Sequence, residues 1–314
     1  MRRRVCELGI RLATVLAAGL FAAAGASPPP GSQPQTVSLY VTVEDGDRLV
    51  TGLTDRNLRV YENGRPRAFR LEEPEKPMLV TLLVEHSQLS WVYLDDIDRA
   101  VREFVNHAPE GHWYSLATFS HGLTVQVDFT KQKGNLLATW SQLGQPSWSE
   151  VDTYDAVWEV LDKLSLLRGR RVLVLIGSGF DTLSARTLDE VRKKIESTDT
   201  VVYAIAAGSL LRGQYDPYLG SAARLDLYRA DGFLKMLADK SGGQAFFPRF
   251  ETAYSDVAKS VLSILAHQYR VVYQPDPSAG EKYRKIKVEA FTIADDKRRD
   301  YSVRAREGWR REGS

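Results

Sequence analysis

The tripeptide Gly177-Ser178-Gly179 follows an apolar run of strand length and could carry a nucleophilic serine on a tight turn. Many hydrolases present a serine in this way within the motif Gly-x-Ser-x-Gly, but the glycine that the motif requires upstream of the serine is absent here. A serine nucleophile also needs a neighbouring base. The candidate bases are five histidines, none of which stands in a recognisable partner motif: His86, His107, His112, His121 and His267. A hydrolase that uses the Ser178 region is therefore an alternative and not the favoured function.

Asp95, Asp96 and Asp98 lie close together and could suggest a metal cluster. The helical periodicity that begins near residue 92 places them at the start of a helix, where carboxylates are favoured by the helix dipole. We therefore interpret them as helix-start residues. The glycine-rich stretches contain no Gly-Lys-Ser/Thr, so a phosphate-binding loop is not indicated.

Trp140 and Trp148 bracket the polar segment 141–147. Tryptophan is enriched among the residues that dominate binding energy in protein interfaces, so the pair could serve a partner. The competing interpretation is packing in the core or at its edge. Both tryptophans are kept as candidate partner-binding residues.

Three apolar runs of strand length predict strands buried on both faces, at residues 79–84, 171–176 and 200–206. Residues 113–119 and 123–129 predict a hairpin. Helices are predicted at residues 92–106, 153–167, 188–196, 231–241 and 252–265, and a surface loop with some helix at 210–223. This alternation predicts an α/β fold with a doubly wound, mostly parallel, Rossmann-like sheet, whose carboxyl-terminal edge is the usual place for a ligand.

Both ends of the chain alternate in the strand period. Near the start these are residues 37–43, 58–62 and 68–71, with Asn63-Gly64 as a type I′ turn signal. Near the end they are residues 268–274, 285–291 and 301–306. Because the two stretches flank the α/β region, we expect an accessory β-sandwich-like domain drawn from both. The expected boundaries are 36–75 for the N-terminal β segment, 76–266 for the α/β domain and 267–310 for the C-terminal β segment.

Residues 1–26 have the layout of a secretory signal peptide, in which arginines precede the apolar run 12–24 and the sequence Ala24-Gly25-Ala26 follows. The run is shorter than the roughly 20 residues that span a bilayer, so we expect no membrane span after cleavage; an uncleaved anchor is the alternative. Residues 27–35 predict a Pro-rich linker. The protein is expected to be exported, to the periplasm or the exterior.

Composition limits the remaining functions. Cys6 is the only cysteine and lies in the signal segment, so the mature chain would have neither a disulfide nor a thiolate metal site. Loss of residues 1–26 would change the formal charge from +2 to −1, which leaves no basic footprint for nucleic acid. Hydrophobic residues at 43% and charged residues at 26% are ordinary globular values, so the chain should fold.

Several segments resemble motifs of a single family. Leu53-Thr54 and the run 58–64 match its leading β motif, Leu237-Ala238 with Gly242-Gly243 match its "lA..tGG" element, and residues 268–273 and 304–309 match its closing strands. Residues 85–89, 152–157 and 173–181 stand where its three metal-binding loops belong. On these motifs, nearly all of the mature sequence resembles the von Willebrand factor type A-related family of secreted bacterial proteins.

The resemblance implies a metal-ion-dependent adhesion site, in which Mg²⁺ or Mn²⁺ is shared between the domain and a carboxylate of its ligand. The family pattern is Asp-x-Ser-x-Ser in the first loop, Thr in the second and Asp in the third. Ser87 and Thr153 match it, whereas Glu85, Leu89 and Ser178 depart from it. Because Mg²⁺ demands near-octahedral oxygen ligation, we predict a vestigial site that binds no cofactor, and a site that still binds Mg²⁺ or Mn²⁺ is the alternative.

Nearby carboxylates at Asp152, Asp155 and Asp181 could compensate in part for the lost ligands. We predict a non-enzymatic, exported protein that binds another protein, in adhesion or in a related interaction. The candidate partner-binding residues are Glu85, His86, Ser87, Thr153, Ser178, Trp140 and Trp148. A structural envelope component without a ligand site is a further alternative, and the sequence identifies neither the partner nor the oligomeric state.

Overall fold

The computed structural model describes residues 36–209, 213, 215, 218–277 and 280–311. The predicted signal peptide (1–26) and linker (27–35) lie outside the described residues. Within the described ranges, no helix is both long and apolar enough to cross a membrane.

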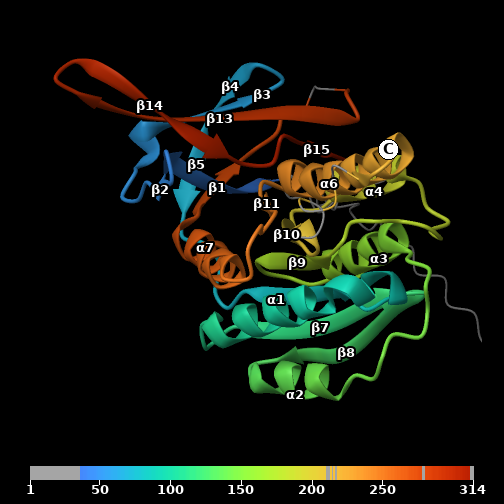
Figure 1. Cartoon of the computed structure of the whole chain (residues 1–314). Coiled ribbons are helices and arrows are strands. Elements are labelled where there is room, and N and C mark those ends of the chain that lie inside the picture. Colours follow the sequence, from blue (N-terminus) through green and yellow to red (C-terminus); the bar gives the residue numbers. More distant parts are fainter. Residues whose placement is uncertain (1–35, 210–212, 214, 216–217, 278–279, 312–314) are drawn as a thin grey trace, which may run out of the picture. The chain divides into compact units, whose positions relative to one another are not determined.

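A six-stranded sheet forms the centre of the α/β region (Figure 1). Its strands, in spatial order, are β11 (Gln244–Phe246), β10 (Val201–Ala206), β9 (Arg171–Gly177), β6 (Leu79–Glu85), β7 (Trp113–Ser120) and β8 (Gly122–Thr130). All neighbours pair in parallel except β7 and β8, which form an antiparallel hairpin. The predicted α/β class is confirmed.

Helices cover both faces of this sheet (Figure 1), which explains why its inner strands are apolar without alternation. One face packs against α1 (Leu94–His107), α2 (Gly134–Gln142) and α7 (Ala253–His267). The other packs against α3 (Thr153–Ser165), α4 (Leu188–Ser197) and α6 (Ser221–Ser241). Along β6 the side chains divide between the two cores, with Leu82 on the first face and Leu83 on the second.

Two helices differ from the sequence prediction. Helix α6 begins at Ser221, so residues 221–230, expected within a loop or before a helix, are helical. Most of that stretch is exposed and therefore lacks the apolar period that marks a helix in sequence. Helix α2 was not predicted, because only Leu136 and Trp140 of its nine residues are buried.

The β segments from the two ends of the chain pair directly with each other. Their strands are β1 (Val37–Asp45), β2 (Arg48–Leu49), β3 (Leu58–Glu62), β4 (Arg65–Arg67), β5 (Phe69–Glu72), β12 (Tyr269–Tyr273), β13 (Tyr283–Ala294), β14 (Lys297–Arg304) and β15 (Gly308–Arg310). Strand β1 pairs with β12 through residues 37–41 and with β14 through residues 42–44. All nine strands belong to one hydrogen-bonded sheet, and a sandwich of two separate sheets is not confirmed.

Asn63 and Gly64 form the expected turn, with φ angles of 49° and 78° that suit a type I′ hairpin. The partner of β3 is β4, whereas β5, which was expected to continue this hairpin, pairs with β12. Strands β4 and β5 stand at opposite ends of the strand order, yet only Ala68 separates them in sequence. The sheet must therefore curl until its ends meet, around a core that includes Leu39, Leu58 and Trp309.

Glu62 is a charged residue inside this curled sheet, with an exposed fraction of 1%. Its carboxylate accepts hydrogen bonds from the indole of Trp309 (3.1 Å) and the backbone N–H of Asp276 (2.9 Å), and it lies 3.4 Å from the guanidinium groups of Arg67 and Arg284. A buried carboxylate persists only with such compensation. Glu62 thus ties β3 to β15, β4 and β13.

Replacement of Glu62 by Gln is expected to lower the free energy of unfolding by about 3 kcal/mol, because it removes the buried negative charge that lies beside the guanidinium groups of Arg67 and Arg284. Urea unfolding followed by tryptophan fluorescence measures this change. The matched control is Glu289→Gln, whose carboxylate pairs with Lys287 and Arg298 at the surface and should contribute little. Equal losses in the two variants would contradict the role assigned to Glu62.

Candidate functional site

The predicted site residues come together at the carboxyl-terminal edge of the six-stranded sheet. Glu85 is the last residue of β6 and Ser178 follows the last residue of β9. Since β6 and β9 are neighbouring parallel strands, their carboxyl ends bring these two side chains side by side. Thr153 is the first residue of α3, at the same edge.

The Glu85 carboxylate is enclosed and fully engaged by protein donors. Oε2 accepts hydrogen bonds from the backbone N–H and the hydroxyl of Ser178, both at 2.6 Å, and Oε1 accepts one from the Ser87 hydroxyl at 3.0 Å. Glu85, Ser87 and Ser178 are each 0% exposed. A Cβ at Gly177 would stand 2.9 Å from Oε2, so glycine there is what allows the carboxylate to approach β9. Glu85 therefore fastens the first loop to the third.

The remaining oxygens of the site also hold loops together. The Thr153 hydroxyl donates to the carbonyl oxygen of Phe180. Asp181 accepts from the backbone N–H of Tyr154 at 3.0 Å and from the Ser184 hydroxyl, and so caps the first turn of α3 from the third loop. The second and third loops are thus joined through protein contacts alone.

This donor set does not fit a resident Mg²⁺ or Mn²⁺. The ion requires oxygen lone pairs directed at one point, whereas the hydroxyls of Ser87 and Thr153 donate to protein acceptors and Glu85 already accepts three hydrogen bonds. Leu89 supplies no oxygen and is 38% exposed. Among the described residues, no group of three or more His, Cys, Asp or Glu is arranged to hold a metal ion.

Several predicted partner-binding residues are buried and cannot touch a partner in this structure. Glu85, Ser87, Thr153 and Ser178 are each 0% exposed, so they support the edge of the sheet from beneath. Trp140, which was assigned to the same surface, is also buried. It is 8% exposed and its indole donates to Asp98 at 3.0 Å, as in core packing.

Trp148 and His86 are the members of the predicted surface that reach solvent. Trp148 is 52% exposed and its ring stacks on His121 with ring centroids 4.7 Å apart, and the backbone carbonyl oxygen of Trp148 accepts a hydrogen bond from the backbone N–H of Gln88 in the first loop. His86 is half-buried, with its ring edge-on to that of Trp140, and burial lowers the pKa of its imidazole.

A cavity of about 600 Å³ opens beside the second loop, with Asp152, Asp155 and Glu190 in its lining. Asp155 accepts from the backbone N–H groups of Ala185 (2.8 Å) and Arg186 (2.9 Å), which fixes the third loop on α3. Asp152 accepts from the backbone N–H of Gly122 at 2.6 Å. These carboxylates therefore position loops, a role that their place in the sequence alone did not reveal.

The geometry does not support the hydrolase alternative. The Ser178 hydroxyl is buried and donates to a carboxylate, and each histidine has a different neighbour. The five contacts are His86 with Trp140, His107 with the carbonyl oxygen of Glu103, His112 with the N–H of Met78, His121 with Trp148, and His267 with the carbonyl oxygen of Ser263.

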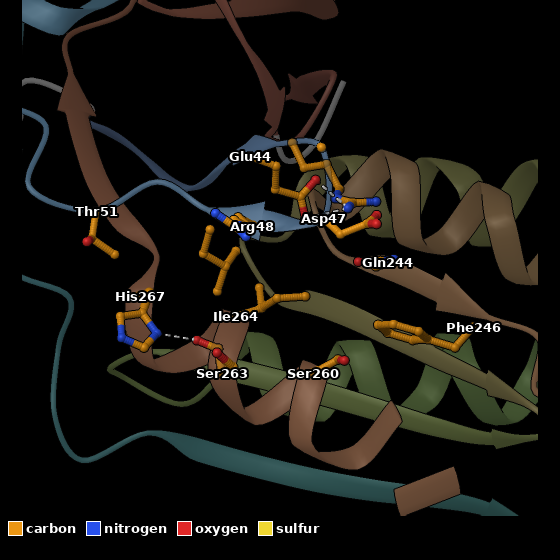
Figure 2. A pocket seen from close by; sticks show the side chains of 13 residues that line it. Glu44, Asp47, Arg48, Thr51, Gln244, Phe246, Ser260, Ser263, Ile264 and His267 are labelled. Atoms are coloured by element: carbon orange, nitrogen blue, oxygen red, sulfur yellow. Dashed lines mark hydrogen bonds and ion pairs between the residues drawn. The ribbon is translucent and has the colours of Figure 1, made fainter. Parts of the chain in front are cut away.

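A separate cavity of about 510 Å³ lies between the β1–β2 hairpin, β11 and α7 (Figure 2). Its histidine, His267, lies 2.8 Å from the carbonyl oxygen of Ser263, and its Glu44 is paired with Arg304 at 2.5 Å. His267 and Glu44 are thus already engaged, and among the described residues of this cavity no hydrogen bond joins a serine hydroxyl to the histidine.

Titration of residues 27–314 with Mg²⁺ and Mn²⁺ is expected to give no saturable heat at millimolar metal, because the Glu85 carboxylate is occupied by protein donors. Isothermal calorimetry of the wild type beside Thr153→Ala checks this. Saturable binding that disappears in Thr153→Ala would show that the loops rearrange into an adhesion site.

Burial raises the pKa of Asp152 from 3.8 to about 6. A carboxyl whose pKa is higher in the folded state favours folding when protonated, so its contribution is present below about pH 4 and is lost as the pH rises through 6. Asp152→Asn keeps an acceptor for Gly122 and does not titrate. Melting temperatures at pH 4 to 7 should show the wild type losing stability relative to Asp152→Asn with rising pH. A constant difference would refute the assignment.

No family model matches the chain, and no curated protein matches it. Solved structures resemble it at low identity. An aerotolerance-related membrane protein from Bacteroides fragilis is 13% identical, with a TM-score of 0.43, and the match covers 59% of this chain and 98% of that one. The protein BatB from Bacteroides thetaiotaomicron is 10% identical, with a TM-score of 0.41, over 60% of this chain and 99% of that one. A von Willebrand factor type A protein from Catenulispora acidiphila is 9% identical, with a TM-score of 0.43, over 91% and 76% of the two chains. The last is named for the family that the sequence motifs resemble.

Proposed function

We propose that the chain is an exported protein-binding module that binds its partner, without a metal ion, at the carboxyl-terminal edge of its six-stranded sheet. The observation that carries this proposal is the distribution of exposed apolar side chains. Connections that follow the carboxyl ends of parallel strands share one edge of a sheet. Most of the large exposed apolar residues lie in those connections or in the first eight residues of the helices that follow them, and Trp148 lies against two of them through His121 and Gln88. These residues are Leu89, Val92, Trp148, Leu183, Leu188, Tyr215, Tyr218, Leu225, Tyr228 and Phe250.

Exposed apolar residues scattered over a surface need no explanation, but their collection at one edge does. Val92 is 67% exposed after β6, Trp148 is 52% exposed before α3, and Phe250 is 69% exposed before α7. Aromatic side chains such as Trp148 offer a large contact area at a small entropy cost, which suits the centre of an interface. We name this surface the apolar edge.

The closed site beneath the apolar edge supports binding rather than catalysis. Glu85 and Asp181 join the loops that carry the exposed residues, and a surface that is already ordered loses less entropy when a partner binds. An ion-dependent adhesion site works by offering an open coordination position to its ligand. Here the Glu85 carboxylate accepts hydrogen bonds from Ser178 and Ser87, so affinity would come from apolar contact area.

The test uses immobilised residues 27–314 to capture proteins from a cell-envelope extract, with and without EDTA. A specific captured protein should persist in EDTA and be lost with Val92→Glu or Trp148→Glu, which place a charge in the apolar edge. The matched control is Ile293→Glu, because Ile293 is similarly exposed (65%) but lies on β13. Capture that requires a divalent ion, or that is insensitive to the first two variants, would refute the proposal.

A further inference from the structure

A polar cavity of about 400 Å³ lies at the opposite, amino-terminal edge of the six-stranded sheet. It is bounded by the starts of β1 and β9, the ends of α3 and α4, and β12 and β15. Four arginines line it, with Asp199 as the carboxylate in its lining: Arg171, Arg270, Arg306 and Arg310. Guanidinium groups gathered around a cavity indicate recognition of an anion, provided that their charges are not already balanced.

Two of the four arginines are fully balanced. Arg171 pairs with Asp199 and donates to the last carbonyls of α3, those of Leu164 (3.2 Å) and Ser165 (3.1 Å). Arg270 pairs with Glu72 at 2.8 Å and Glu75 at 2.6 Å. These groups shape the cavity but have no charge to spare for a ligand.

Arg306 is different, because it is buried without a carboxylate. It is 7% exposed, and its two hydrogen bonds go to backbone oxygens, from Nε to Gly308 at 2.9 Å and from Nη2 to Glu196 at 2.7 Å. Among the ion pairs of the described residues, none includes Arg306. The carbonyl of Glu196 is in the last turn of α4, where the helix dipole offers only partial negative charge. Burial lowers the pKa of Arg306 to about 10, as expected for a guanidinium that has lost water without gaining a full counter-charge.

The nearest carboxylate is shared. Glu196 is 1% exposed, and its side chain pairs with Arg310 at 2.9 Å and with Arg192 at 3.6 Å. One buried carboxylate therefore faces two guanidinium groups before Arg306 is counted. In Arg310, Nε and Nη2 both donate to Glu196. Among the described residues no hydrogen bond uses Nη1, so this nitrogen can donate to a ligand. The Ser38 hydroxyl accepts from Arg270 at 3.0 Å and keeps its own hydrogen to donate.

We propose that this cavity is a binding site for a small oxyanion such as phosphate or sulfate, held by Arg306, Arg310 and the Ser38 hydroxyl. The anion supplies the counter-charge that Arg306 lacks, and charge-assisted hydrogen bonds from two guanidinium groups orient it. It also joins the α/β region to the β sheet, because Ser38 lies on β1, Arg310 lies on β15 and the cavity wall includes the end of α4. The site is independent of the apolar edge and of any partner there.

The test is the melting temperature of residues 27–314 in phosphate, sulfate, acetate and chloride at equal ionic strength, followed by calorimetric titration with inorganic phosphate. Phosphate or sulfate should raise the melting temperature above that in chloride, and their order identifies the preferred anion. Arg306→Gln should abolish this rise. Because that variant may not fold, Arg310→Gln serves as a second test and should weaken phosphate binding about tenfold.

The control is Arg299→Gln, which removes an exposed arginine of β14 that pairs with Asp45 away from the cavity, and it should keep wild-type binding. Equal melting temperatures in phosphate, sulfate and chloride would overturn the proposal. An undiminished phosphate effect in Arg310→Gln would overturn it as well, and so would an effect of acetate as large as that of phosphate.

Discussion

The burial of one carboxyl group, that of Glu85, is the constraint on which the carboxyl-terminal edge of the six-stranded sheet depends. A carboxyl group with no exposed surface is tolerated only when it has hydrogen-bond partners, and here Ser178 and Ser87 supply them. Those donors belong to two loops that follow two neighbouring strands, so the hydrogen bonds of a single buried side chain fix both loops. Gly177 is required for this arrangement, because any side chain there would collide with the carboxylate.

The contact between the α/β region and the β sheet also depends on a buried side chain whose hydrogen bonds must be satisfied, in this case the guanidinium group of Arg170. Arg170, 2% exposed at the start of β9, donates to the carbonyl of Leu265 (2.8 Å) and to the side chain of Gln268 (2.7 Å), and Gln268 in turn donates to Thr42 on β1. The guanidinium also lies over the ring of Tyr40 at 5.0 Å. A buried arginine can donate to acceptors on segments that are far apart in sequence. Its hydrogen bonds fix the relative orientation of those segments more strictly than apolar packing does.

The sequence was sufficient for the parts of the fold that depend on local pattern. The apolar runs of β6, β9 and β10 and the Asn63-Gly64 turn carry their own signals, and strand adjacency then brings Glu85 and Ser178 together. The burial of the site residues could not be predicted from the sequence, because it depends on loops that follow different strands and close over the site. Trp140 illustrates this: its exposure is set by Asp98 and the helix α1 that carries it, 42 residues away. The pairing of β5 with β12, instead of with β3 in the expected hairpin, likewise depends on where a distant strand lies.

Under the proposed function, the closed site around Glu85 and the exposed apolar residues above it have complementary roles in binding without a metal ion. A site that holds an ion must keep polar groups open to water, and it gains affinity when a ligand carboxylate completes the coordination. In this chain the Glu85 carboxylate instead accepts hydrogen bonds from Ser178 and Ser87 and holds the loops together. The proposed binding therefore relies on the surface above these loops. Leu89 stands where the adhesion pattern has a serine, is 38% exposed, and contributes in two ways. It removes an oxygen from the site and adds apolar area to the face that a partner would meet.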